Sequence, residues 1–481
     1  MGIDLGIVIF YFVIINLIGM KYSASRSFGG YFLGDRSIPW MISCFSIVAT
    51  ETSTLTFISI PGLSYNSGMG FLQVAFGYLV GRVFVALILI PKYFEGKFET
   101  VYEFLQARFN VFSRRVVSVI FHITRFLADS VRLFATAIPL SIITGWDYRI
   151  SVIVIGIATF LYTYFGGLRS IVVVDSIQLF LYIGCAIFGM ILISRYTSLS
   201  FLSIFQQISR DGLKIVSSGL EDGFYSLFGT YNIFSGIIGG AFLSFASHGT
   251  DHLIVQRVLA CRDENSAKKA MIFSGIIVIF QFMLFLLFGL FIKLFLNGIG
   301  FERSDEIVPY FIVHHLPVGV RGIMLAGIFA AAMSTLSSSI NSLSSSTSAD
   351  ILQINIRKIT EKRKVALSRY ISLAWTVIIV TISCILKNTK SPLVEIGLSI
   401  ASVTYGGMMG IFLMGRFLRD FSDKAAICGM IISIIVNILV MSFTGIFWLW
   451  YVCIGAIVSF VCGVIINSIF KRVVGTRLQK G

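Results

Sequence analysis

The chain has 481 residues, of which 56% are hydrophobic and only 13% are charged. A soluble protein of this length carries about 25% charged residues, so the composition excludes a water-soluble enzyme or binding domain and predicts an all-α polytopic membrane protein. The formal net charge is +15. In a soluble protein this charge would indicate nucleic-acid binding, but in a membrane protein its distribution between the loops has to be considered first.

Long apolar runs bounded by charges or turn residues predict thirteen transmembrane helices. Their approximate limits are 4–20, 38–64, 70–91, 116–144, 149–165, 170–194, 233–256, 270–297, 318–348, 366–386, 392–415, 425–443 and 446–470. The first run is expected to be a retained helix, because Asp4 precedes it and it has neither a basic start nor a small-residue cleavage site.

The Lys and Arg residues are divided unequally between the two sides of the predicted helices. With the N-terminus outside, 26 of the 38 fall in inner loops, among them Arg257, and 8 fall in outer loops. The other four lie in or at the ends of spans: Arg82, Arg125, Arg132 and Arg321. This bias predicts a multi-pass protein of the cell (plasma or inner) membrane with an outside N-terminus and a cytoplasmic C-terminus. The basic charge is therefore topological, and no nucleic-acid partner is expected.

The second span carries a carboxylate deep in the membrane. Glu51 lies about 13 residues into the span, about 20 Å along a helix. The neighbouring hydroxyl residues are Thr50, Thr52, Ser53, Thr54 and Thr56. Hydroxyl side chains compete for backbone hydrogen bonds, so a helix break here would free carbonyl oxygens for a hard cation. The alternative is an intact helix in which a neighbouring helix pairs with Glu51.

The fourth span carries Arg125, Asp129 and Arg132 on one helical face. The row could be neutralised internally, or an end of it could contact an anionic group of a substrate.

Polar residues also interrupt the sixth and seventh spans. Asp175 lies about six residues beyond Arg169, roughly 9 Å along a helix, so it could pair with Arg169, reach the interface or serve a cation. The segment 247–252 in the seventh span contains two His residues that flank Gly249 and Asp251. It predicts a second helix break, although two satisfied packing His residues are the alternative.

The ninth span has eleven Ser or Thr residues among the fifteen from Ser334 to Ser348. Small hydroxylated helices approach their neighbours closely and bond across the interface, which explains most of these side chains. Ser338 and Ser345 lie near the same face as Ser334. Two or three such hydroxyls are enough for a cation site.

The two interrupted spans are separated by four intact ones. This spacing is typical of two inverted five-helix repeats with a binding site between the breaks. We therefore expect a single domain over 1–481, with repeats at 38–194 and 233–415, an extra helix at 4–20 and two extra helices within 425–470.

Motifs for enzymatic chemistry are missing from the sequence. It contains no GxxxxGK[ST], HExxH or GxSxG, and its seven Cys include no CxxC pair. No catalytic residues are expected, and the chain is not expected to be an enzyme.

Five segments together resemble the sodium:solute symporter family over nearly the whole chain. They are 49–62, 102–109, 164–178, 256–257 and 330–337, and the most specific are Gly-Gly-x-Arg followed by Asp-x-x-Gln, and Ala-Ala-x-x-Ser-Thr. The resemblance implies a LeuT-type fold and sodium-coupled symport of a small polar organic solute by alternating access. The alternative is a sodium channel or a sensor on the same fold. The implied partners are the solute, sodium ions and the lipid bilayer, and a monomer is expected to suffice.

The resemblance also implies sodium-binding residues, for one or two ions per cycle. The principal site takes backbone carbonyls and two hydroxyls, at positions Ala49, Thr52, Ala331, Ser334 and Thr335. A second site in some members takes an Asp and hydroxyls, at positions Asp175, Ser334, Ser337 and Ser338.

Family substrate contacts come from around the breaks and leave the solute open among sugars, sialic acid, amino acids and carboxylates. The matching residues here are Glu51, Ser53, Thr56, Phe71, Gln73, Ser247, His248 and Asp251, with Arg125 and Arg132 as anion contacts. Members that take sialic acid carry Arg and Gln where this chain has Ala128 and Ala75, which argues against that substrate. Glu51 is similar to the acidic residue that proline-type members carry at this position, which relates it to ion coupling more than to the choice of substrate.

Overall fold

The computed structural model describes residues 2–22, 27–208, 210–219, 224–228, 231–386 and 393–478, and over these ranges the chain is helical with no β-strand. Arg26, Lys387, Lys390 and Lys480, counted in the charge distribution, lie outside the described residues, as does position 392. The longer helices are α1 (Gly2–Lys21), α3 (Trp40–Glu51), α4 (Thr54–Ser67), α5 (Leu72–Ile88), α8 (Val111–Thr144), α9 (Tyr148–Thr197), α12 (Gly240–Gly249), α13 (His252–Leu259), α14 (Glu264–Phe295), α16 (Val320–Ser346), α17 (Glu361–Ile385), α18 (Leu393–Phe417), α19 (Asp423–Phe443) and α20 (Trp450–Leu478). The shorter ones are α2 (Phe28–Leu33), α6 (Ile90–Glu95), α7 (Glu103–Arg108), α10 (Phe201–Gln207), α11 (Arg210–Leu213) and α15 (Ile307–His315).

Within the described residues, nine helices are long and apolar enough to cross a membrane, and the bent pair α3–α4 makes a tenth. The expected all-helical polytopic fold is confirmed, whereas the count of thirteen spans is not. Two of the differences have a visible cause. The predicted spans 149–165 and 170–194 both lie within α9 and are separated only by the non-helical backbone of Gly167, and the seventh predicted span is divided into α12 and α13, of 10 and 8 residues.

Both predicted helix breaks are present. Thr52 and Ser53 have extended backbone angles, and α3 meets α4 at 64°. Thr250 ends α12, and the Asp251 side chain accepts a hydrogen bond from the Leu253 backbone N–H at 2.8 Å, which caps α13. Both breaks fall where polar side chains replace the apolar run, as their hydrogen-bonding chemistry predicts.

Gly167 bends α9 between the two predicted spans. Its φ is 60°, a left-handed conformation that favours glycine, and a Cβ at this position would lie 2.6 Å from the Tyr31 carbonyl oxygen. The chain therefore turns at Gly167 while α2 packs closely against it.

Outside the membrane-spanning segments, α14 begins with a capping carboxylate. The Ser266 backbone N–H donates to Asp263 at 2.8 Å, and this bond lowers the pKa of Asp263 below its ordinary value.

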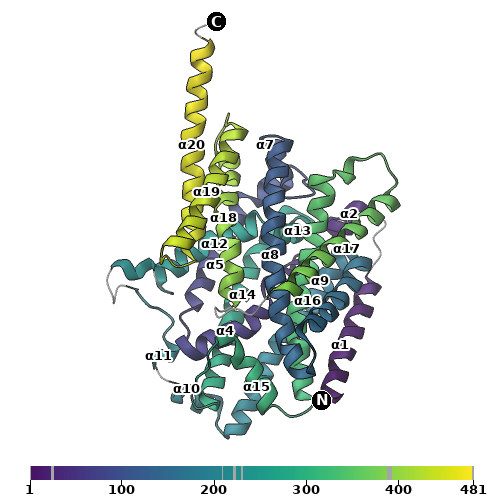
Figure 1. Ribbon diagram of the computed structural model, residues 1–481, viewed down its shortest axis with the longest axis vertical. Helices are drawn as coiled ribbons and strands as arrows, with labels where there is room; N and C mark the ends of the chain where they lie inside the picture. Colours follow the sequence, from purple (N-terminus) through teal and green to yellow (C-terminus); the bar gives the residue numbers. More distant parts are fainter. Residues whose placement is uncertain are drawn as a thin grey trace.

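Helix α16 is almost wholly enclosed by other helices and packs against α9, α8 and α1 (Figure 1). Every residue from Met324 to Ser346 is buried, including the hydroxyl run. The outer helices, such as α1 and α19, expose many large apolar side chains, as lipid contact requires. The start of α1 and the end of α20 lie at opposite ends of the molecule.

Candidate functional site

The break between α3 and α4 lies against the hydroxyl-rich middle of α16. The Thr335 hydroxyl lies 3.1 Å from the Thr50 carbonyl oxygen of α3 and 3.3 Å from the Ala331 carbonyl oxygen of its own helix. Ala49 and Ala331 are fully buried. Because the last carbonyls of a helix have no partner along the chain, the break presents hard oxygen ligands beside the Thr335 hydroxyl. Such a set can coordinate a small hard cation.

Asp175 lies next to this break, in a fully buried cluster of hydroxyl groups. Its carboxylate accepts hydrogen bonds from Ser46 at 2.5 Å and Ser334 at 2.7 Å, and the Thr50 hydroxyl lies at 3.4 Å. The Ser337 hydroxyl instead donates to the Ser334 carbonyl at 3.0 Å. The interpretations in which Asp175 pairs with Arg169 or reaches the interface are wrong, because α9 directs this carboxylate into the core.

Arg257 provides the positive charge opposite Asp175. The sequence placed Arg257 in an inner loop, and that placement is wrong: the residue lies in the last turn of α13 and is fully buried. Its guanidinium lies 3.3 Å from the Asp175 carboxylate, donates to Ser46 at 2.8 Å and contacts Ser338. The short α13 carries Arg257 inward after the break, which a continuous span would not do.

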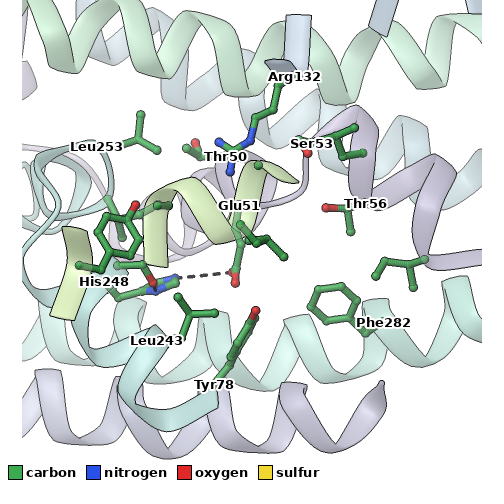
Figure 2. A pocket seen from close by; sticks show the side chains of 18 of the residues that line it. Thr50, Glu51, Ser53, Thr56, Tyr78, Arg132, Leu243, His248, Leu253 and Phe282 are labelled. Carbon is green, nitrogen blue, oxygen red and sulfur yellow. Dashed lines mark hydrogen bonds and ion pairs between the residues drawn. The ribbon is translucent and has the colours of Figure 1, made fainter. Parts of the chain in front are cut away.

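A cavity of about 90 Å³ lies beside the α3–α4 break and touches helices from both predicted repeats. Eight of the predicted substrate and anion contacts line it: Glu51, Ser53, Thr56, Phe71, Ser247, His248, Arg125 and Arg132. Tyr78, Phe282 and Tyr405 also line it, and they were not predicted from the sequence. Figure 2 shows Arg132 reaching towards Thr50 and Ser53 on one side, while His248, Leu243 and Tyr78 lie on the other.

Glu51 is held by two basic groups on its own side of the cavity. The Arg82 guanidinium of α5 contacts the Glu51 carboxylate, and the Nε2 atom of His248 lies 3.6 Å from it. Arg82 is fully buried and also donates to Ser274 at 2.6 Å. A half-buried carboxylate of this kind is compensated by its neighbours. Glu51 therefore pairs with a neighbouring helix, as one interpretation expected, but the helix that carries it is broken rather than intact.

The row of charges on α8 is also present, with unequal partners for its two Arg residues. Arg125 contacts the Asp251 carboxylate, donates to the Tyr405 hydroxyl at 2.6 Å and lies 3.7 Å from Asp129. Arg132 contacts Asp129 at 3.0 Å, and its side chain is 17% exposed. Arg132 is therefore the more accessible of the two guanidinium groups.

Two predicted contacts do not line the cavity. Gln73 donates to the Gly70 carbonyl at 3.1 Å and lies 3.4 Å from the Ser217 backbone nitrogen. Asp251 lies behind Arg125 and Tyr405 and holds both. Ala75 and Ala128 are buried and also do not line it.

Arg82 was recognised in the sequence as a basic residue within a span, but not as the partner of Glu51. An Arg inside an apolar span is as unusual as Glu51, and that signal could have paired the two residues. Tyr405 gave no comparable signal, because Tyr is common in membrane helices.

Comparison with known proteins agrees with this geometry. The sequence profile of the sodium:solute symporter family matches residues 31–433. The chain is 26% identical to the sodium/sialic acid symporter NanT of Aliivibrio fischeri, over 96% of this chain and 92% of that protein. It is also 26% identical to the human sodium-coupled monocarboxylate transporter 2, over 86% of this chain and 67% of that protein. The structure of a substrate-bound, outward-open Na+-coupled sialic acid symporter superposes with a TM-score of 0.84 at 24% identity, covering 97% of this chain and 98% of that one, which shows a shared fold.

Proposed function

We propose that this chain, which belongs to the sodium:solute symporter family, couples sodium entry to the uptake of a small organic anion. It is a multi-pass membrane transporter rather than an enzyme, and it carries a small polar organic solute with sodium by alternating access. The anionic class of the solute is the part that we propose.

The observation that carries this proposal is the position of Arg132. Its guanidinium lines the cavity and has Asp129 as its one ion-pair partner among the described residues, whereas Arg125 is engaged by Asp251 and Tyr405. Because a guanidinium can bind a carboxylate through two parallel hydrogen bonds, Arg132 is suited to a carboxylate substrate. Two relatives named for sialic acid and for monocarboxylates support an anionic solute.

The rest of the cavity fits the uncharged part of such a solute. Glu51 is compensated by Arg82 and His248, so it adds no net negative charge to repel an anion. The hydroxyls of Thr56 and Tyr78 can bond polar groups, and other lining residues are apolar. A carboxylate with a polar or apolar body fits this lining.

For the principal sodium ion, we propose the carbonyls of Ala49, Thr52 and Ala331 with the hydroxyls of Ser334 and Thr335. The contact from Thr335 to the Thr50 carbonyl supports this assignment, because it brings a hydroxyl of α16 to the broken end of α3.

For a second sodium ion, we propose Asp175 with the hydroxyls of Ser334, Ser337 and Ser338. The bond from Ser334 to Asp175 supports this assignment. Since Arg257 lies at the same carboxylate, a sodium ion there shares Asp175 with a fixed positive charge and is expected to bind less tightly than the principal ion.

We further propose thirteen spans, with α8, the pair α12–α13 and two halves of α9 added to the clearly apolar helices. The repeats are then 38–194 and 233–415, and transport needs only a monomer. The opposite positions of the start of α1 and the end of α20 support an odd number of spans (Figure 1). The proposal that the N-terminus lies outside rests on the unequal distribution of Lys and Arg. Labelling by an impermeant thiol reagent tests this orientation: a Cys at exposed Arg363 should react in inverted vesicles only, and reaction in intact cells would contradict it.

Binding of candidate solutes to the purified protein tests the anionic class. A panel of monocarboxylates, neutral polyols and amines is added in sodium or potassium buffer, and thermal stabilisation is measured. We expect carboxylates alone to stabilise the protein, and only in sodium. Arg132→Gln should weaken this binding by about 30-fold or more, and Arg132→Lys should weaken it less, because Lys keeps the charge without the paired geometry. Stabilisation by amines or polyols, or an unaffected Arg132→Gln variant, would contradict the proposal.

A further inference from the structure

A second cavity lies at the ends of α6 and α18 and shares no lining residue with the cavity beside the α3–α4 break. Its volume is about 730 Å³, and its lining comes from α6, α7 and the last turn of α18 with the residues just after it. Four basic side chains line it: Lys92, Arg108, Arg416 and Arg419. Glu95 is the one acidic residue among its lining side chains. These four basic residues form what we call the basic pocket.

Backbone carbonyls hold two of these guanidinium groups in place. Arg108 donates to the Gly415 carbonyl at 3.0 Å and also contacts the Leu418 carbonyl. Arg416 donates to the Ile88 carbonyl at 3.3 Å. Because a carbonyl carries no formal charge, these bonds orient the cations without neutralising them. Two positive charges are thus fixed before any ligand binds.

The remaining groups leave the pocket with an excess of positive charge. Lys92 pairs with Glu95 at 2.5 Å, which accounts for the one acid. Arg419 is exposed and has no hydrogen bond or ion pair within the described part of the chain. Arg108 and Arg419 therefore have no acidic partner in the described ranges, and Arg416 shares Glu95 with Lys92, so the lining keeps three more positive than negative charges.

The pocket lies at the level where two membrane spans end. The candidate spans Leu72–Glu95 and Gly397–Phe417 both end at its lining residues. The Phe417 side chain is 55% exposed, and the Arg416 guanidinium lies 5.3 Å from its ring. An exposed apolar ring beside cations suits the boundary between the lipid tails and the anionic headgroups.

The general excess of basic residues on the inner side explains the sign of these charges. That excess does not explain why four basic side chains line one cavity, or why backbone carbonyls hold two of their guanidinium groups in place. Convergent Arg groups match the oxygens of a phosphate.

We propose that the basic pocket binds a phosphate group, that of an anionic lipid headgroup, and so bridges α6 and α7 to the end of α18. This site is independent of the solute and sodium sites. Phosphatidylglycerol supplies the phosphate together with acyl chains that extend along the exposed apolar helices.

Native mass spectrometry of the full chain tests this proposal. Protein in phosphatidylcholine nanodiscs is titrated with phosphatidylglycerol in one arm and with inorganic phosphate in the other, at low salt. We expect one phosphatidylglycerol to be retained per chain. Arg419→Gln should weaken its binding about fivefold, and Arg416→Gln with Arg419→Gln roughly 30-fold. Arg419 has no partner to lose, so its variant is expected to fold.

The matched control is Lys362→Gln with Arg363→Gln, which removes two exposed charges assigned to the same side but outside the pocket. Equal weakening by the control, or no weakening in the pocket variants, would overturn the proposal. Saturable binding of inorganic phosphate without a preference for phosphatidylglycerol would overturn the lipid as the source.

Discussion

Charged residues in the core of this protein are balanced in pairs around the cavity and the helix breaks. Glu51 faces Arg82, and the fully buried Asp175 faces Arg257. Removing one partner of a buried pair costs about 3–5 kcal/mol, because the other charge is left uncompensated. Substitutions that test function should therefore preserve this balance or be made in both partners.

Thr335 provides the cleanest test of the principal sodium site. Thr335→Val keeps the shape but removes the hydroxyl, so we expect the sodium affinity for uptake to fall at least about tenfold. Thr335→Ser keeps the hydroxyl and should stay close to the parent protein. Ser344→Ala is the control on the same helix, since this hydroxyl donates to the Ser368 carbonyl instead. Sodium dependence of uptake is the measurement, and a Thr335→Val variant equal to the parent would refute the assignment.

Asp175 tests the second sodium ion. Asp175→Asn should lower the sodium Hill coefficient of uptake to about one, because only the principal ion then binds cooperatively with the solute. The variant leaves Arg257 uncompensated, so its thermal stability should also fall. The double variant with Arg257→Gln should recover part of the stability but not the Hill coefficient. An unchanged sodium Hill coefficient in both variants would contradict the second sodium site.

The sequence revealed buried charges better than it revealed their partners. Glu51 and Asp175 stand out because each interrupts an apolar run. Arg257 was misplaced because its partner lies 82 positions away, on another helix, and hydropathy gives no information on that packing.

Helices in this fold are shaped by breaks and by close approaches of the backbone. The breaks at Thr52–Ser53 and Thr250–Asp251 were predictable, because polar side chains interrupt the apolar run at both places. Asp251 accepts from the Leu253 backbone N–H, and the Thr50 carbonyl accepts from Thr335 of α16. The separation of the two predicted spans in α9 also falls at a glycine pair, but the sequence did not show that the non-helical backbone there is confined to Gly167, because such a pair is equally compatible with a longer loop. Local chemistry identified the breaks, while the path of the chain after each one depends on tertiary contacts.

Gly77 tests one of these close approaches. A Cβ at this position of α5 would lie 2.2 Å from the Gly236 carbonyl oxygen, so Gly77→Ala forces α5 away from the segment Ser235–Gly239 that leads into α12. We expect a loss of about 1–3 kcal/mol, seen as a lower unfolding temperature in detergent. Gly184→Ala on α9 is the control, because no atom lies within 4 Å of its added Cβ. Equal unfolding temperatures for the two variants would contradict the packing.

For the whole molecule, composition predicted a polytopic helical membrane protein. The polar residues at the two helix breaks predicted the region in which the cavity lies. The sequence left the solute open because recognition depends on side chains from helices far apart in the chain. In the folded protein, Arg132 of α8 and His248 of α12 face one cavity. The anionic class that we propose for the solute rests on this juxtaposition.

Coupled flux in proteoliposomes tests this central claim most directly. Uptake of a carboxylate that stabilises the purified protein is measured together with radioactive sodium entry, with and without an inward sodium gradient. We predict that the gradient drives accumulation of the carboxylate, that the carboxylate in turn increases sodium entry, and that Arg132→Gln abolishes both effects. Sodium entry that is indifferent to every carboxylate, as in a channel, would contradict the account.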